Sequence, residues 1–105
     1  MNEPSVAADL DLLHRILSTY LAGRPVRVFL FGSVARGRSC RTSDIDIAVL
    51  PLAPLPPGVL AELRGALEEA NLLHEVELLD LKEVDPAFRE RILREGTEWA
   101  VPANV

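Results

Sequence analysis

The chain has 105 residues, of which 49% are hydrophobic and 26% charged, a balance typical of one globular domain spanning residues 1–105. Its unbroken apolar runs are far shorter than the roughly 20 residues that a membrane span needs. The net charge of −5 argues against broad nucleic-acid binding, and the single cysteine excludes an internal disulfide and fits a reducing cytoplasm.

The first part of the chain predicts a helix followed by a strand. Apolar residues recur at three- and four-residue steps over Val6–Leu21, which is the period of an amphipathic helix. Ser5 is expected to cap this helix and Gly23 to end it. Val26–Phe31 reads VRVFLF, a β-branched and aromatic run that predicts a strand.

A second strand is predicted over Ile45–Leu50, after a short helical turn over Val34–Gly37 and a polar loop over 37–43. Side chains alternate between the two faces of a strand. One face therefore carries Asp44, Asp46 and Ala48, and the other carries Ile45, Ile47 and Val49.

The middle of the chain predicts a loop, a helix and a strand. Four prolines within residues 51–58 are incompatible with a helix or a central strand and indicate a stiff loop. An apolar stripe predicts a helix over Gly58–Leu72. The run EVELLD predicts a strand over Glu75–Asp80.

The C-terminal part predicts one more helix, with Asp85 as its N-cap, Pro86 at its first position and Gly96 at its end. Three of its apolar residues are expected to face inward: Phe88, Ile92 and Leu93. A short extended piece is expected over Thr97–Val101. This order of elements predicts an α/β (α+β) fold, in which helices flank a small mixed sheet.

Two aspartates at the start of the second predicted strand are candidate metal ligands. Asp44 and Asp46 share one face of the strand, with Cα atoms about 6.5–7 Å apart. Two such carboxylates repel each other unless a cation lies between them, and Mg²⁺ prefers carboxylate, water and phosphate oxygens. A solvated strand edge is the alternative interpretation of an isolated Asp-x-Asp pattern.

Gly32 and Ser33 directly follow the first predicted strand. Glycine lets the backbone approach a ligand closely, and a helix N-terminus behind it would offer N–H groups to a phosphate. The same dipeptide also fits an ordinary strand-to-helix turn. Residues 12–43 carry six arginines and no acid, which predicts a local anion site in an otherwise acidic chain.

Together the two motifs resemble the signature of the DNA polymerase beta-like nucleotidyltransferase superfamily. Residues 31–37 read FGSVARG and residues 43–49 read SDIDIAV, with ten residues between Ser33 and Asp44. This spacing resembles the GS-x10-DxD pattern of the minimal nucleotidyltransferase (MNT, or MntA-type) family. The resemblance covers about residues 10–100 and implies the polymerase beta-like nucleotidyltransferase fold.

The resemblance implies a role for each matching residue. Asp44 and Asp46 would be catalytic metal ligands. The third carboxylate of the family, usually an aspartate, falls on Glu77 in the run VELL; a surface position on an edge strand is the alternative for this residue. Nucleotide contacts are implied for four residues: Gly32, Ser33, Arg36 and Ser43.

The implied activity is nucleotidyl transfer that depends on Mg²⁺, with two ions and ATP as the substrate. Because 105 residues leave no room for an acceptor domain, the resemblance points to a HEPN-domain toxin whose tyrosine receives AMP, with this chain as the antitoxin. One alternative is a nucleotide-binding subunit that neutralises a HEPN partner by contact. Another is a small-molecule, antibiotic-type nucleotidyltransferase. A homo- or hetero-oligomer is compatible with these interpretations.

The remaining polar and aromatic residues are expected to be structural. His14 and His74 match no metal-ligand spacing, and Cys40 lacks a nearby histidine. Phe88 and Trp99 are expected in the core or an interface. Six glutamates are expected on solvated helix faces: Glu62, Glu68, Glu69, Glu90, Glu95 and Glu98.

Overall fold

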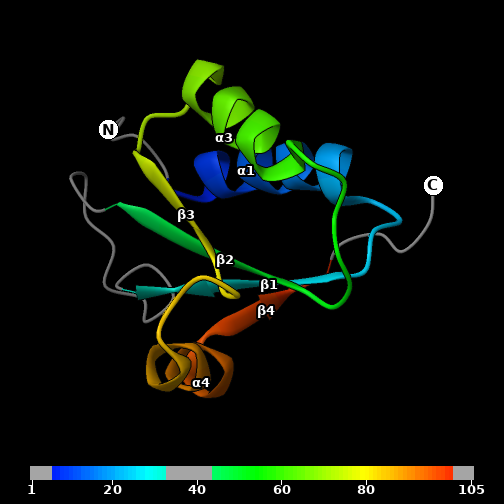
Figure 1. Cartoon of the computed structure of the whole chain (residues 1–105). Helices are drawn as coiled ribbons and strands as arrows, with labels where there is room; N and C mark the ends of the chain where they lie inside the picture. The colour runs from blue at the N-terminus through cyan, green and yellow to red at the C-terminus, as the bar shows by residue number, and fades with distance from the viewer. Residues whose placement is uncertain (1–5, 33–43, 101–105) are drawn as a thin grey trace.

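The structure, a computed structural model, describes residues 6–32 and 44–100. Within these stretches the elements are α1 (Val6–Leu21), β1 (Val26–Phe31), β2 (Ile45–Pro51), α3 (Val59–Glu69), β3 (Val76–Asp80), α4 (Pro86–Glu95) and β4 (Thr97–Trp99) (Figure 1). The predicted small mixed sheet with flanking helices is confirmed. None of the described helices is both long and apolar enough to cross a membrane.

The four strands form one sheet in the order β3-β2-β1-β4. β1 pairs antiparallel with both β2 and β4, whereas β2 and β3 are parallel. A parallel pair needs a crossover connection, and α3 supplies it between β2 and β3. β3 and β4 are therefore the two edge strands of the described sheet.

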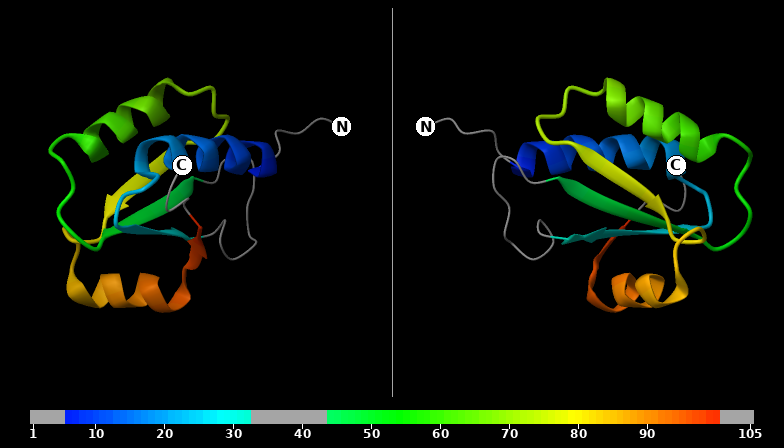
Figure 2. Two further views of the ribbon diagram at one scale, coloured as in Figure 1. Left: turned by 90° about the vertical axis from the view of Figure 1, so that its right-hand side faces the viewer. Right: turned by 60° about the vertical axis from the view of Figure 1, so that its left-hand side comes forward.

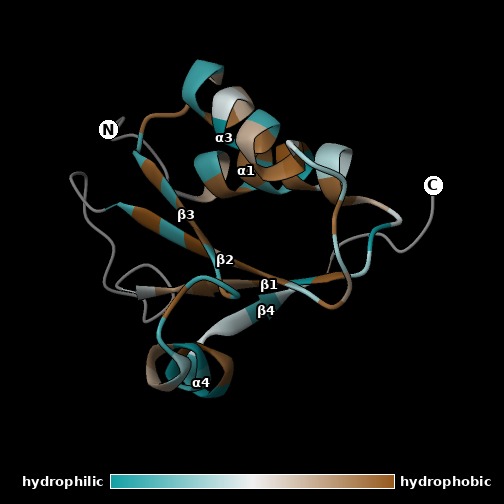
Figure 3. Cartoon of the chain, viewed as in Figure 1, coloured by the Kyte–Doolittle hydropathy of each residue, from teal (hydrophilic) through white to brown (hydrophobic). Residues whose placement is uncertain are grey.

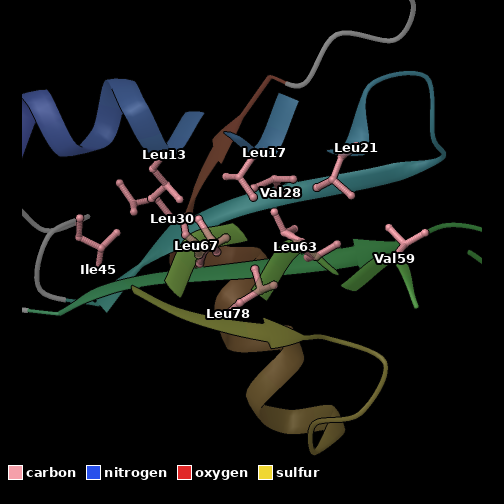
Figure 4. Packing of buried hydrophobic residues seen from close by; sticks show 12 residues of the cluster. Leu13, Leu17, Leu21, Val28, Leu30, Ile45, Val59, Leu63, Leu67 and Leu78 are labelled. Atoms are coloured by element: carbon pink, nitrogen blue, oxygen red, sulfur yellow. The ribbon is translucent and has the colours of Figure 1, made fainter. Parts of the chain in front are cut away.

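Helices cover both faces of the sheet. α1 and α3 lie on one face and α4 lies on the other (Figure 2). The larger core lies beneath α1 and α3, where Leu13, Leu17 and Leu21 of α1 point toward the sheet (Figure 4). β2 is predominantly hydrophobic because it is central and covered on both faces (Figure 3).

A smaller core lies beneath α4. It consists of Phe29, Ala48, Leu81 and Ile92, with partly buried apolar side chains around them. Ala48 belongs to the polar face predicted for β2, so α4 buries one end of that face. The other end carries Asp46 and lies beyond the core.

Several boundaries differ from the prediction by a few residues. The helix predicted over Gly58–Leu72 ends at Glu69, because Ala70 adopts an extended conformation and its N–H donates to Leu67 O. β3 begins at Val76, one residue late. β2 continues to Pro51, which the proline content had assigned to a loop. Proline is tolerated there because the strand ends, and the next N–H, that of Leu52, donates to Pro25 O at 2.7 Å.

The predicted caps of α4 are confirmed in part. Asp85 accepts hydrogen bonds from the N–H groups of Ala87 and Phe88, and Pro86 occupies the first turn. Gly96 does end the helix, but its φ of −76° is not left-handed. Glycine is needed there because a Cβ would lie 2.8 Å from the carbonyl oxygen of Ile92.

Two further expectations were wrong. Phe88 is 37% exposed and does not face the core as expected, although its ring contacts Phe31 edge-on; its expected place in an interface stays a prediction. Glu98 lies on β4, not on a helix, and forms a two-bond ion pair with Arg27 of β1. Four other expectations lie outside the described residues: the Ser5 cap, the turn over Val34–Gly37, the loop over 37–43 and the environment of Cys40.

Candidate active site

The predicted site begins with a row of side chains that crosses three strands. Phe31 of β1 pairs in register with Asp46 of β2, and Asp46 pairs with Glu77 of β3. Residues directly opposite each other on neighbouring strands share one face and lie about 5 Å apart. The sheet therefore brings Glu77 beside Asp46, although the two are far apart in the sequence.

The three carboxylates at this site, those of Asp44, Asp46 and Glu77, repel one another. Asp44 and Glu77 are exposed, whereas Asp46 is partly buried. Burial raises the pKa of Asp46, and the negative charges of Glu77 and then of Asp44 raise it further. Three carboxylates thus interact without any described cation to offset them, and the fold accepts a cost in stability at this place.

Gly32 closes the site on the β1 side. Its φ of +81° lies in the left-handed region that favours glycine, and a Cβ added there would overlap Asp46 Oδ2. Glycine is therefore required at residue 32 for two independent reasons. Ser33, Arg36 and Ser43 lie outside the described residues.

The donor set fits Mg²⁺ in its chemistry. Asp44, Asp46 and Glu77 supply hard oxygen atoms, and a bound cation would oppose the burial and the neighbouring acids that raise the pKa of Asp46. In residues 6–32 and 44–100, no three potential ligands already converge to hold an ion. Mg²⁺ does not require such a cage, because it is usually held by one or two carboxylates together with water and substrate phosphates.

A buried hydrogen-bonded contact between Asp9 and His74, which the sequence did not reveal, holds the segment that leads into β3. Asp9 Oδ2 lies 2.6 Å from His74 Nδ1, and the Asp9 carboxylate also accepts the N–H groups of Leu73 and His74. Both side chains are almost completely buried. Burial alone would raise the pKa of Asp9, but these hydrogen bonds outweigh it and hold the pKa below its usual value. The expected structural role of His74 is confirmed, and Asp9 joins it.

His14 is structural as well. Its Nε2 lies 2.7 Å from Ala100 O, and its ring contacts Trp99 edge-on with centroids 5.4 Å apart. Trp99 in turn packs against the larger core. These contacts connect α1 with β4 and leave His14 remote from the carboxylate row.

The structure thus brings Asp46, Glu77 and Gly32 together, as the resemblance to nucleotidyltransferases led us to expect. Residues 11–99 match the family described as Polymerase beta, Nucleotidyltransferase, and the chain belongs to this family.

Curated relatives carry adenylyltransferase names. The chain is 35% identical over 65 residues to the "Probable protein adenylyltransferase MntA" of Haemophilus influenzae. This match covers 62% of this chain and 57% of the relative. It is also 35% identical over 71 residues to the protein adenylyltransferase MntA of Shewanella oneidensis. That match covers 68% of this chain and 50% of the relative. The chain thus spans about half the length of these two relatives.

A solved structure shows the same fold. It is a crystal structure of a toxin–antitoxin complex with AMP-PNP, with a TM-score of 0.66 and 29% sequence identity. The match covers 89% of this chain and 73% of that one. The polymerase beta-like fold expected from the sequence is therefore confirmed.

Proposed function

We propose that this chain is a Mg²⁺-dependent nucleotidyltransferase that transfers AMP from ATP to a tyrosine hydroxyl of a HEPN-domain toxin, and so acts as the antitoxin of the pair. The observation that carries the proposal is the placement of Asp46 between Gly32 and Glu77. The names of the MntA relatives and the toxin–antitoxin complex with AMP-PNP support the acceptor and the nucleotide. The single cysteine is compatible with a cytoplasmic setting.

Each of the three acids has its own role in the proposed reaction. Asp44 and Asp46 would hold the nucleotide-side Mg²⁺, and Glu77 would hold a second ion or accept the proton of the attacking hydroxyl. Bound Mg²⁺ would neutralise the charge on the phosphates as the reaction proceeds. The hydroxyl oxygen forms a bond to the α-phosphorus, the bond from that phosphorus to the β-phosphate bridge breaks, and pyrophosphate leaves.

We assign the remaining nucleotide contacts to residues between β1 and β2. The backbone at Gly32 can approach a phosphate because no Cβ intervenes, and Ser33 would add a hydroxyl donor. Arg36 would offset phosphate charge, and Ser43 would orient Asp44.

The first test is AMP transfer with purified proteins. The chain is incubated with labelled ATP, Mg²⁺ and the HEPN-domain protein encoded beside it, and label on that protein is measured. The double variant Asp44→Asn/Asp46→Asn should lose the label, whereas Asp11→Asn, which changes an exposed acid of α1, should keep it. Labelling that survives the double change would refute the assignment of the aspartates.

The same assay separates the two alternatives. A chain that neutralises its partner by contact would inhibit the HEPN protein without labelling it. An antibiotic-type enzyme would label an aminoglycoside with no protein acceptor present. Either result would replace the proposed acceptor.

A further inference from the structure

The outer side of β3 offers backbone groups that no described residue uses. Ile45 N–H donates to Glu75 O and Leu81 N–H donates to Val49 O, each at 2.8 Å. Peptide groups alternate in direction along a strand, so those of Val76 and Leu78 point away from the sheet. Of the backbone groups of Val76 and Leu78, only Leu78 O has a partner among the described residues, Arg64 Nη2 at 3.3 Å; at the far end of the strand Asp80 O accepts from Glu83 N–H. In the described sheet β3 thus forms an unpaired border beside Val76 and Leu78 (Figure 2).

A cavity of about 500 Å³ lies along this border, between β3 and the C-terminal half of α3. Its lining includes apolar side chains of α3 and β3 together with three acids: Glu68, Glu75 and Glu77. Arg64 also lines the cavity and its Nη2 donates to Leu78 O, so the lining carries three acids against one arginine. We call this cavity and the adjoining edge of β3 the β3 groove.

We propose that the β3 groove binds an extended basic segment of the acceptor protein, which adds to β3 as a strand and brings its hydroxyl to Glu77. This inference rests on the proposed function, because Glu77 is the acid expected to meet the acceptor. An edge strand gives backbone affinity to an added strand, and adjoining pockets select alternate side chains. Glutamates that line the groove select positive charge.

The alternation fixes the pattern of the bound segment. Side chains on the face of Glu75 and Glu77 would be lysine, arginine or the hydroxyl-bearing tyrosine. Side chains on the opposite face would lie with Val76 and Leu78, against the apolar residues of α3, and would be apolar. The buried contact of Asp9 with His74 holds the start of β3 in place, so the groove is formed before the segment arrives.

The test uses a fluorescein-labelled peptide of alternating lysine and valine with one central tyrosine, and fluorescence anisotropy with the full chain in the absence of ATP. Val76→Pro removes an outward N–H and leaves the pairing with β2 intact, so binding should be lost. Glu75→Lys, which changes an exposed acid on the face expected to meet the lysines, should weaken binding by about fivefold at low salt. Glu69→Lys is the matched control, because it makes the same charge change at an exposed residue that does not line the groove.

The outcomes are distinct. Equal affinities for Glu75→Lys and Glu69→Lys would overturn the proposal even if Val76→Pro fails to fold. Tight binding of a peptide with glutamate in place of lysine would overturn it too, as would dimerisation of the chain through β3 in sedimentation. If the chain binds the peptide but transfers no AMP, the proposed function fails and the groove stands. If AMP transfer to the partner is unaffected by Glu75→Lys and the peptide does not bind, the groove fails and the proposed function stands.

Discussion

Gly32 is packed so tightly against Asp46 that a Cβ on the glycine would overlap the Oδ2 atom of the aspartate. The register explains this contact, because Phe31, the residue before Gly32, pairs directly with Asp46. Gly32 and the carboxylate of Asp46 are therefore in direct steric contact. A larger side chain at Gly32 displaces the carboxylate.

We expect Gly32→Ala to abolish AMP transfer. The substitution strains a left-handed backbone, at a cost of about 1–2 kcal/mol, and its Cβ displaces the Asp46 carboxylate. Transfer to the partner protein and unfolding in urea would be measured on the same preparation.

Gly58→Ala is the matched control for this change. Gly58 has a φ of +87°, so alanine is strained in the same way, but a Cβ there meets nothing within 4 Å. The control should lose similar stability and retain transfer. Equal loss of transfer in both variants would show that strain alone, and not the contact with Asp46, is responsible.

We expect Asp46→Asn to stabilise the fold while it inactivates the enzyme. The pKa of Asp46 is raised by burial and by the neighbouring acids, so its ionised form destabilises the folded state at neutral pH. Removing the charge should raise the Tm by roughly 3 °C at pH 7, and the gain should shrink as acidification protonates the wild-type carboxyl. A lower Tm for the variant at pH 7 would contradict the stated origin of the pKa shift.

The rate of AMP transfer should depend more on the charge of the Glu77 side chain than on its length. Its register with Asp46 is set by the backbone, so aspartate at this position keeps a carboxylate beside Asp46, set back by one methylene. Glu77→Gln should lower kcat by at least about 100-fold, as expected for loss of a proton acceptor or metal ligand. The kcat of Glu77→Asp should lie between that of Glu77→Gln and that of the wild type. Single-turnover transfer of labelled AMP measures both, and full activity of Glu77→Gln would remove Glu77 from the reaction.

The contact between Asp9 and His74 should make stability fall in acid. The pKa of Asp9 is lowered in the folded chain, so its contribution is complete above the ordinary value of 3.8 and is lost as the pH falls below it. Asp9→Asn should cost about 2–3 kcal/mol at pH 7, because a neutral amide oxygen accepts the N–H groups of Leu73 and His74 more weakly than a carboxylate, and the amide nitrogen cannot accept the second contact from Leu73 N–H. Urea unfolding between pH 7 and pH 3 measures both effects.

Asp11→Asn is the control for the acid experiment, because Asp11 is exposed on the same helix. Its unfolding curves should follow those of the wild type throughout. An Asp9→Asn variant that loses stability in acid as steeply as the wild type would contradict the assignment to Asp9.

Local patterns predicted most of the fold because they act over a few residues. The apolar repeat of α1 and the VRVFLF run of β1 gave both boundaries correctly, and the side-chain alternation correctly placed Asp46 opposite the larger core. The end of β2 was less predictable. Whether Pro51 extends a strand depends on its pairing with Val26, which is not local.

Long-range partners set the limit of the sequence interpretation. Asp9 looks like an ordinary acid in the first turn of a helix, and nothing near it indicates a partner 65 residues away. Likewise, the motif suggested Glu77, but only the parallel register of β2 and β3 brings it opposite Asp46. Its role, like those of Ser33, Arg36 and Ser43, stays a prediction.

The strand order also affects how the chain is synthesised. Arg27 on β1 meets Glu98 on β4 across 71 positions, whereas the row of Phe31, Asp46 and Glu77 belongs to strands that leave the ribosome earlier. While β4 is still being made, β1 presents an open hydrogen-bonding edge to other nascent chains. The short β4 strand therefore protects the nearly finished sheet from aggregation as well as completing it.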